Sequence, residues 1–400
     1  MKNQMESVIS AARVFVSADS PVINNGAIAI RGDRIAAVGS RSEIIASFTD
    51  KELHLPEATL CPGLIDCHEH LMGTGPFAKG TLELNEPDAM FALVFAHACG
   101  STLKKGVTTV RVPGTRGGVD LIVKRAAHHG TVASPRLWCA GQAITMTGGH
   151  GHGVGVEVDG PTACARAARS QLARGADFLK VMSSGGVGVV RVGEEPTHPE
   201  FSVEEMRAVV DVANAARRRV ASHADGIEGI SNSLEAGVHC IEHGIYLSAG
   251  HARHMASNNV ALVPTLSTMT AIAFKTKELN LEPSWQPIAE SILEVHRQSF
   301  RAALDAGVLF ATGTDSFGDI VDEMIELTTY GISRNEAIRA ATASGANVIG
   351  LHDVGILAPG NLADIIAVPG DPLEDLEVFR EPSLVIAGGR QVQVNASACG

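Results

Sequence analysis

Apolar strand-like segments alternate with helical stretches through the middle of the chain, and this alternation constrains the fold more than any other feature. Eight such segments follow one another over roughly 250 residues, the usual length of an eight-stranded α/β barrel. The candidate strands lie at residues 61–70, 107–112, 136–140, 177–182, 220–223, 238–243, 260–264 and 308–312. An open doubly wound sheet would usually carry a glycine-rich phosphate loop after its first strand, and the sequence has none at that place. The alternation therefore predicts an α/β fold with a TIM-like (β/α)8 barrel.

Both ends of the chain consist instead of short strand-like runs separated by Gly, Asn and Asp. These runs lie at residues 12–16, 26–30, 34–39, 363–368 and 384–392. Two strand-rich ends around a different middle predict a small β-sandwich domain that residues 1–60 and 358–400 build together. Residues 61–357 would then form the barrel domain. A chain of 400 residues is longer than one core usually supports, which agrees with two domains.

The composition restricts the partners of the protein. A net charge of −12 argues against nucleic acid and anionic membranes. No apolar segment approaches the roughly 20 residues that cross a bilayer, and the first residues lack the features of a signal peptide. Seven cysteines without a Cys-x-x-Cys pair are typical of a reducing cytoplasm. We therefore expect a cytoplasmic protein that binds neither nucleic acid nor membrane. As separate expectations, the protein forms a homo-oligomer and acts on a small molecule.

The first candidate strand ends in a histidine pair. Residues 61–70 read CPGLIDCHEH, which places His68 and His70 two positions apart. Side chains at i and i+2 of a strand point to the same side, so both imidazoles can reach one metal ion. This signal is weak alone, because the chain has 16 histidines. Cys67 lies on the opposite face of that strand, where packing is the better interpretation.

Lys180 lies inside an apolar strand, where a bare ammonium group would be costly to bury without a partner. One interpretation is that its stem is buried and its head reaches water at the strand end. The other is that CO2 has carbamylated the amine. A carbamate offers carboxylate-like oxygens that can bridge two metal ions, whereas an ammonium is no ligand. For Lys180 considered alone, the two interpretations have equal weight. The other candidate ligands favour the carbamate.

Three further candidate ligands follow other strands. His223 and His243 end two consecutive strands, one strand–helix repeat apart, and would face the same end of the barrel as the first pair. A single histidine at a strand end is more often structural, but two at successive repeats are hard to explain by packing. Asp315 follows the last strand and could cap the next helix. Ser316 and Asp319 can supply that cap instead, which leaves Asp315 for chemistry.

This order of residues resembles the amidohydrolase superfamily in its two-metal form. The resemblance rests on His-x-His after the first strand, a lysine after the fourth, histidines after the fifth and sixth, and an aspartate after the eighth. The motifs PGLIDCHEH at 62–70, TGTD at 312–315 and GILAPGNLAD at 355–364 also match, so the likeness covers nearly the whole chain. The segment TGGHGH at 147–152 is similar to the imidazolonepropionase-like group, which includes prolidase-type and arginine carboxypeptidase-type dipeptidases and ochratoxin-type amidases.

The resemblance implies a binuclear metal centre that hydrolyses an amide-type bond. A hydroxide between the ions would attack the carbonyl, Asp315 would pass its proton to the leaving nitrogen, and His150, expected at the end of the third strand, would donate to the oxyanion. Zinc is the preferred metal, with manganese, cobalt and iron left open. The implied ligands are His68, His70 and Asp315 for one ion, His223 and His243 for the other, and carbamylated Lys180 between them.

Substrate contacts are harder to predict from the residues. Prolidase-like relatives often have Tyr two residues after the histidine of the fifth strand, where this chain has Asp225, and this difference weakens a strict prolidase assignment. Tyr246 could take over that role or serve only as a lid contact. Arg191, in a glycine-rich loop, could pair with a substrate carboxylate, although an exposed loop arginine is more often only solvated.

The leading hypothesis is a hydrolase of N-acyl amino acids, dipeptides or related xenobiotic amides. The same site could instead cleave a carbamate, phenylurea, lactone or phosphotriester, and only a substrate screen separates these reactions. Mononuclear deaminases and imidazolonepropionases resemble the family without the lysine of the fourth strand. A non-enzymatic barrel protein would usually have lost some ligands, and this sequence retains all six.

Overall fold

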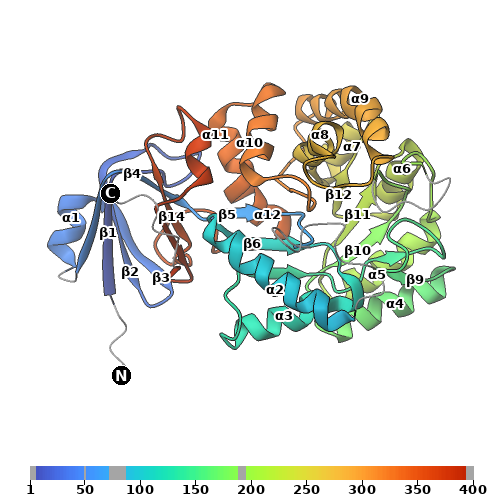
Figure 1. The fold of residues 1–400 in the computed structure, drawn as a ribbon, viewed down its shortest axis with the longest axis horizontal. Coiled ribbons are helices and arrows are strands. Elements are labelled where there is room, and N and C mark those ends of the chain that lie inside the picture. The colour runs from blue at the N-terminus through green and yellow to red at the C-terminus, as the bar shows by residue number, and fades with distance from the viewer. Residues whose placement is uncertain (1–5, 49–50, 72–86, 188–194, 393–400) are drawn as a thin grey trace.

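The computed structural model describes residues 6–48, 51–71, 87–187 and 195–392. Figure 1 shows a β domain at the left, made of blue and red segments, beside a larger part in which strands and helices alternate. The blue and red colours show that both ends of the chain build the β domain. Among the described residues, no helix combines the length and the apolar character needed to cross a membrane.

The β domain is a seven-stranded sheet in the order β16-β15-β14-β4-β1-β2-β3. All neighbours are antiparallel except β1 and β4. The β domain expected from both chain ends is therefore confirmed. Its strands are β1 (Glu6–Val14), β2 (Ile23–Arg31), β3 (Arg34–Ser40), β4 (Glu52–Pro62), β14 (Ile365–Pro369), β15 (Leu384–Ala387) and β16 (Arg390–Val392).

Alternating side chains give this sheet two apolar faces. Ala27 and Ala29 of β2 pack near Ile44 of helix α1 (Arg41–Ser47), whereas Ile28 and Ile30 belong to the core on the other face. Successive residues of a strand point to opposite faces, so a run that is apolar at every position is buried on both sides. The small alanine side chains allow the helix to approach the sheet closely.

The barrel strands pair in parallel in two groups, β5-β6-β7 and β13-β12-β11-β10-β8-β9. Single backbone contacts join the groups into a ring. The N–H of Asp177 donates to the last residue of β7 at 2.8 Å, Leu262 forms a parallel bridge with Phe310, and the N–H of Cys67 donates to the carbonyl of Thr312 at 2.9 Å. The strands are β5 (Leu64–Asp66), β6 (Val107–Val112), β7 (Arg136–Cys139), β8 (Ile144–Thr145), β9 (Val156–Glu157), β10 (Leu179–Met182), β11 (Val220–Ala224), β12 (Cys240–His243) and β13 (Ala261–Val263).

Three of the expected strands differ from the sequence analysis. The first is shorter than expected, because residues up to Pro62 belong to β4 and β5 ends at Asp66, so His68 and His70 follow the strand instead of lying in it. The third is divided into β7 and β8, because the chain turns at Gly141, which has a φ of 77° and whose N–H is held by the buried Asp120 carboxylate at 2.9 Å. His150 therefore does not end the third strand but lies in the turn between β8 and β9. The eighth strand is reduced to a bridge at Phe310.

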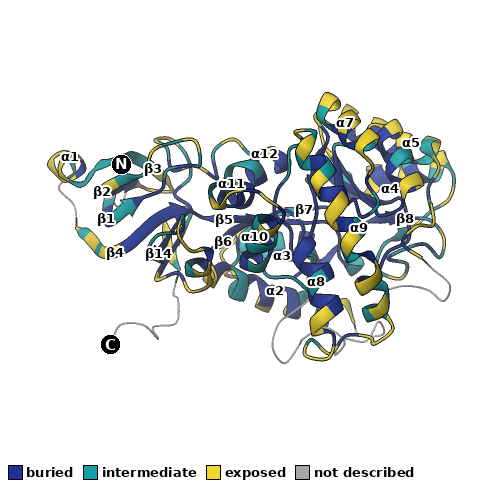
Figure 2. Ribbon diagram, turned by 90° about the horizontal axis from the view of Figure 1, so that it is seen from above, coloured by how far each residue is buried: buried dark blue, intermediate teal, exposed yellow. Residues whose placement is uncertain are grey.

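Helices cover the outside of the barrel. Figure 2 shows their outward sides in yellow around strands in dark blue, as expected for parallel strands that are buried on both faces. In the described residues the helices after α1 are α2 (Asp88–Lys104), α3 (Val119–His128), α4 (Pro161–Ala173), α5 (Val203–Ala215), α6 (Ile227–Ala236), α7 (Ala249–Asn258), α8 (Leu266–Lys275), α9 (Trp285–Asp305), α10 (Ile320–Thr329), α11 (Arg334–Arg339) and α12 (Gly345–Ile349).

Candidate active site

A cavity of about 760 Å³ lies where the barrel strands end. Parallel strands bring their carboxyl ends to one face of a barrel, and active sites of this architecture are built there. The cavity is lined by all six residues that the sequence analysis proposed as ligands and by His150. These are His68, His70, His150, Lys180, His223, His243 and Asp315.

One group of possible ligands consists of His68, His70 and Asp315, whose donor atoms all lie within 4.8 Å of one another. The Nδ1 atoms of His68 and His70 lie 2.5 Å from the Glu242 carboxylate and 2.7 Å from the Gly114 carbonyl. Since these partners can only accept, both Nδ1 atoms donate, and in a neutral imidazole Nε2 keeps its lone pair. The two Nε2 atoms lie 3.3 and 3.4 Å from Asp315 Oδ1. Two Nε2 lone pairs and a carboxylate oxygen therefore point to one place, where a bound cation would offset their mutual repulsion.

The backbone around Asp315 is held in an unusual conformation. Asp315 and Ser316 have φ values of 40° and 68°, a region that residues with a Cβ rarely adopt. The Glu69 carboxylate accepts from the Thr314 hydroxyl at 2.7 Å and from the Ser316 N–H at 2.9 Å, so it binds the turn on both sides of Asp315. Asp66 is buried, and its Oδ2 lies 2.6 Å from the same Thr314 oxygen. Because that hydroxyl has only one hydrogen, the Asp66 carboxyl, whose pKa is raised by burial and by the charge of Glu69, donates to it. The first strand thus fixes the position of the aspartate that follows the eighth.

The helix-cap alternative for Asp315 can be judged from the start of α10. Asp319 occupies the cap position, and its side chain accepts from the N–H of Val321 at 2.9 Å. Asp315 lies four residues earlier, beside the two histidines. The expectation that another residue caps this helix is confirmed.

The second group consists of His223, Asp225 and His243, again with donor atoms within 4.8 Å. The ring of His243 lies 2.7 Å, through Nδ1, from the Thr265 hydroxyl. His223 uses the other nitrogen, because its Nε2 lies 2.9 Å from the Gly185 carbonyl and must donate to it. Nδ1 of a neutral His223 is then the acceptor. The rings of His223 and His243 are 4.8 Å apart, and those of His68 and His243 are 4.9 Å apart, so the two groups adjoin.

Lys180 lies in β10, and only 1% of its surface is exposed. Its Nζ has no hydrogen-bond partner among the described residues. Burial lowers the pKa of this amine, although the carboxylates of Glu242 and Asp315 act in the opposite direction. The interpretation in which the lysine head reaches water is therefore wrong. Burying a charged amine without a hydrogen-bond partner is unfavourable in free energy, so the ammonium form of Lys180 is not stabilised by the described residues around it.

Burial and neighbouring charges also shift the pKa values of three other proposed ligands, Asp315, His223 and His243. Burial opposes ionisation of Asp315, but His68 and His70, in the form in which Nε2 carries a hydrogen and no cation lies between them, hold the pKa of its carboxyl well below the usual range. Burial lowers the pKa of His223 and of His243 well below the usual value, so both rings are neutral at pH 7. Neutral imidazoles and an ionised carboxylate are the protonation states that bind metal ions.

A buried ion pair between Arg111 and Glu242 orients His68. Arg111 donates through Nη2 to both carboxylate oxygens of Glu242, at 2.6 and 2.8 Å, and Glu242 in turn binds His68. Burial opposes the charge on Glu242, but Arg111 holds the pKa of its carboxyl far below the ordinary value. Glu242 reaches Arg111 from β12, a strand distant in the sequence. A carboxylate that orients a ligating histidine is a recurring feature of metal sites.

The three predicted substrate contacts have different outcomes. His150 lies in the cavity and stacks on His223, with ring centroids 4.3 Å apart and planes at 17°. Tyr246 packs instead in the apolar cluster around Ile245 and is not among the residues that line the cavity. Arg191 lies outside the described residues.

Sequence reasoning missed several residues of the site. Asp225 was considered only as a replacement for tyrosine, although His223 and Asp225 show the same i, i+2 spacing as the first histidine pair. That spacing could have revealed it. Nothing local to Glu242 or Thr265 indicates their role, since each acts on a histidine of another strand.

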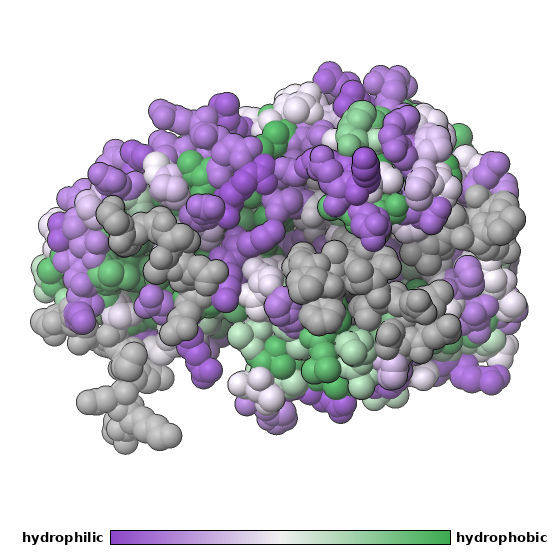
Figure 3. Space-filling view, in the orientation of Figure 1, coloured by the Kyte–Doolittle hydropathy of each residue, from purple (hydrophilic) through white to green (hydrophobic). Residues whose placement is uncertain are grey.

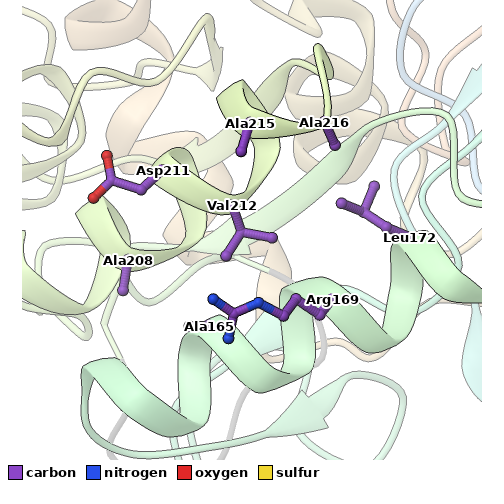
Figure 4. A pocket seen from close by; sticks show the side chains of 8 residues that line it. All are labelled: Ala165, Arg169, Leu172, Ala208, Asp211, Val212, Ala215 and Ala216. Atoms are coloured by element: carbon purple, nitrogen blue, oxygen red, sulfur yellow. The ribbon is translucent and has the colours of Figure 1, made fainter.

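A second hollow of about 550 Å³ lies between α4 and α5. Figure 4 shows that small apolar side chains line most of it, with Arg169 and Asp211 as its charged members. It contains none of the proposed ligands or substrate contacts. The cavity at the strand ends is therefore the candidate active site.

Comparison with known proteins places this geometry among hydrolases. Residues 59–392 match the sequence profile of the Amidohydrolase family, and residues 26–50 match that of the bacterial imidazolonepropionase-like composite domain. The ochratoxinase of Aspergillus niger is 30% identical, over 96% of this chain and 85% of its own length. A crystal structure of a Xaa-Pro dipeptidase with bound methionine superposes with a TM-score of 0.87 at 30% identity, covering 97% of this chain and 99% of the other. The structure of A. niger ochratoxinase gives a TM-score of 0.85 at 27% identity, covering 99% and 97%.

Proposed function

This chain belongs to the amidohydrolase family, and from that premise we propose that it is a metal-dependent hydrolase of amide-type bonds in small molecules. The substrates that fit this function are N-acyl amino acids, dipeptides and related xenobiotic amides. Similarity to a dipeptidase and to an ochratoxinase over nearly the whole chain supports this choice. The observation that carries the proposal is that four imidazoles, Asp315 and Lys180 line one cavity, and that the Lys180 amine has no hydrogen-bond partner among the described residues.

The donor atoms suit a pair of divalent cations. We propose that His68, His70 and Asp315 hold one ion and that His223 and His243 hold the other. Imidazole nitrogens and carboxylate oxygens suit zinc, which we take as the resident metal. Bound ions of this kind supply a water of lowered pKa and polarise a carbonyl oxygen.

We further propose that Lys180 carries a carbamate. The neutral amine and CO2 would form an N–C bond and release one proton, which converts the amine into a carbamate whose two oxygens share one negative charge. Such a group can reach both sets of ligands, because Lys180 lines the cavity between β8 and β11. The buried position of Nζ supports this proposal, since the amine has no other described partner.

The remaining chemistry belongs to side chains of this protein. We propose that Asp315 removes a proton from the attacking water and delivers it to the leaving nitrogen. Its carboxylate is held by the turn that Glu69 fixes, so it needs no reorganisation during the reaction. His150, stacked on His223, would donate a hydrogen bond to the developing oxyanion.

Two further proposals concern the cellular location and the assembly of the protein. The six cysteines within the described ranges are free and buried, which supports a reducing cytoplasm. Leu93 of α2 is 68% exposed and Ile122 of α3 is 48% exposed. Figure 3 shows a green, apolar area over these two helices, and exposed apolar areas often mark protein interfaces. We propose that the protein forms homo-oligomers.

A metal analysis combined with a substrate screen tests the function. We expect two metal ions per chain and turnover of N-acyl amino acids or dipeptides by the purified protein. Asp315→Asn should retain part of the metal and lose at least about 100-fold in kcat. A metal-loaded protein that cleaves only carbamates, phenylureas, lactones or phosphotriesters would contradict amide hydrolysis. A protein without bound metal that still hydrolyses amides would contradict metal dependence.

A further inference from the structure

One side of the active-site cavity is formed by apolar side chains that no proposed chemical step uses. They come from the segment after β10, from α8, from the turn between α8 and α9, from the start of α9, and from the turn after Asp315. We call them the apolar wall. Its members are Val187, Met269, Ile272, Leu281, Trp285 and Phe317.

The apolar wall is packed before any ligand arrives. Val187, Met269, Ile272 and Leu281 are all buried and belong to one hydrophobic cluster. The rings of Trp285 and Phe317 meet edge to face, with centroids 6.0 Å apart and planes at 66°. Surfaces that are already ordered lose little entropy when a ligand binds.

The apolar wall begins next to the reacting groups. The N–H of Phe317 donates to the carbonyl of Asp315 at 2.8 Å, so a single tight turn presents both side chains. Both also line the cavity. A group that packs against Phe317 is therefore close to the bond on which Asp315 acts.

None of the six members of the apolar wall is charged. Apart from His150 and the proposed ligands, the ionisable side chains that line the cavity are Arg116, Asp225 and Glu282. Glu282 is exposed to solvent, and Arg116 pairs with Asp88 at 3.2 Å. A charged substituent placed against the wall would lose its hydration without gaining a partner there.

Resting on the proposed function, we infer that the substrate carries an aromatic ring directly beside the scissile amide bond and that the apolar wall binds this ring. An aromatic ring gains more than a linear alkyl chain here, because aromatic side chains pair edge to face and a methionine sulfur packs favourably on a ring. The position of Phe317 relative to Asp315 places this subsite next to the bond that is cleaved.

Two substrate series test the inference. One series varies the acyl group on glycine, from acetyl through hexanoyl and cyclohexanoyl to benzoyl and naphthoyl. The other varies the amino acid under a constant acetyl group, from Gly through Leu and Lys to Phe and Trp. In one of the two series we expect kcat/KM to rise roughly 10- to 100-fold towards the aromatic member. Equal rates for Lys and Phe derivatives and for acetyl and naphthoyl derivatives would overturn the inference.

Variants of the wall show whether it produces this preference. Trp285→Ala should lose at least about tenfold more in kcat/KM with the aromatic substrate than with the smallest member of the same series. The matched control is Phe274→Ala, since Phe274 lies on α8 but is 66% exposed and does not line the cavity. An equal loss with both substrates would contradict a binding role for Trp285.

Fluorescence gives a measurement that needs no turnover. The chain has two tryptophans, and Trp138→Phe leaves Trp285 as the reporter. Titration with 1-acetonaphthone, which has no amide to cleave, should quench Trp285 saturably, and Phe317→Ala should weaken binding at least fivefold. The absence of saturable quenching would overturn the inference. Saturable quenching without hydrolysis of any amide would support the wall and reject the proposed function, whereas hydrolysis without aromatic preference or quenching would reject the wall alone.

Discussion

Three of the four histidines proposed as ligands have one ring nitrogen beside a partner that can only accept, which fixes their tautomer. Glu242 and the Gly114 carbonyl hold Nδ1 of the first pair, and the Gly185 carbonyl holds Nε2 of His223. The opposite nitrogen is then available for a metal ion. This arrangement explains how residues from separate strands form a prepared set of donors.

Replacing Lys180 tests the buried nitrogen at the centre of the site. Lys180→Ala should lower kcat by at least about 100-fold and reduce the metal content, because no other described side chain that lines the cavity can replace a bridging carbamate. A short carboxylic acid such as propionate should restore part of the activity, since it supplies the missing oxygens. Metal analysis and rate measurements check this, with Lys104→Ala on the exposed end of α2 as the control. Full turnover by Lys180→Ala would rule out the carbamate.

Glu69 is expected to act through the turn that carries Asp315. Glu69→Gln turns an acceptor into a partial donor where Thr314 and Ser316 both donate, so kcat should fall roughly 10- to 100-fold with little change in KM. Thr314→Ser keeps the hydroxyl and should retain most of the activity, whereas Thr314→Val should not. Steady-state kinetics and thermal denaturation distinguish this from general unfolding. A wild-type kcat in folded Glu69→Gln would show that the turn does not depend on this carboxylate.

At the scale of elements, the start of α8 links the proposed ligand His243 to α10 in the outer layer of helices. Thr265 precedes the helix with a φ of 51°, which is unfavourable for a β-branched residue, and its hydroxyl contacts His243. The Glu323 carboxylate of α10 accepts from the N–H groups of Leu266 and Ser267 at 3.2 and 2.7 Å. Glu323 thus takes the capping role that Thr265 does not fill.

This buried cap predicts a dependence of stability on pH. Burial raises the pKa of Glu323 from 4.5 to about 7. The folded state then binds more protons than the unfolded state between these values, so the contribution of Glu323 is fully present below pH 4.5 and is lost as the pH rises through 7. The loss is up to about 3 kcal/mol. Glu323→Gln should flatten the fall in thermal stability between pH 5 and 8, whereas Glu278→Gln in an exposed turn should leave it unchanged. Identical pH profiles for wild type and Glu323→Gln would contradict the prediction.

At the scale of the whole molecule, the site ties the ring of strands together. The proposed ligands come from the segments after β5 and after Phe310, and from β10, β11 and β12. The barrel also contacts the β domain, where Arg136 donates to the buried Asp364 carboxylate at 2.6 Å. The boundaries at residues 60/61 and 357/358 remain a prediction, which proteolysis can test.

Metal removal should therefore destabilise the entire barrel. Each ion present at a free concentration 100 times its dissociation constant adds about 2.7 kcal/mol to the free energy of unfolding, so the removal of both ions by a chelator should lower Tm by about 5 °C or more. Circular dichroism with and without chelator, followed by addition of zinc, measures this shift. His68→Ala serves as the control, because it should reduce the response. An unchanged Tm after verified metal loss would show that the ions are not part of the stable core.

The sequence by itself determined the order of the strands and the position of each proposed ligand. Apolar periodicity is a local property, so it places His68 and His70 at the end of the first strand and indicates that Lys180 is enclosed in the fourth. The residue at the end of each strand is also fixed along the chain. The family resemblance then assigned these residues to one centre.

Only the tertiary structure decided what surrounds the ligands. Glu242 lies far from His68 in sequence, as does Glu69 from Asp315, and their pairing depends on how the barrel closes. The bend at Gly141 depends on Asp120, and the apolar wall gathers side chains from several separate elements. Local patterns specify which way a side chain points, but the partner that it meets is set by packing between segments distant in the chain.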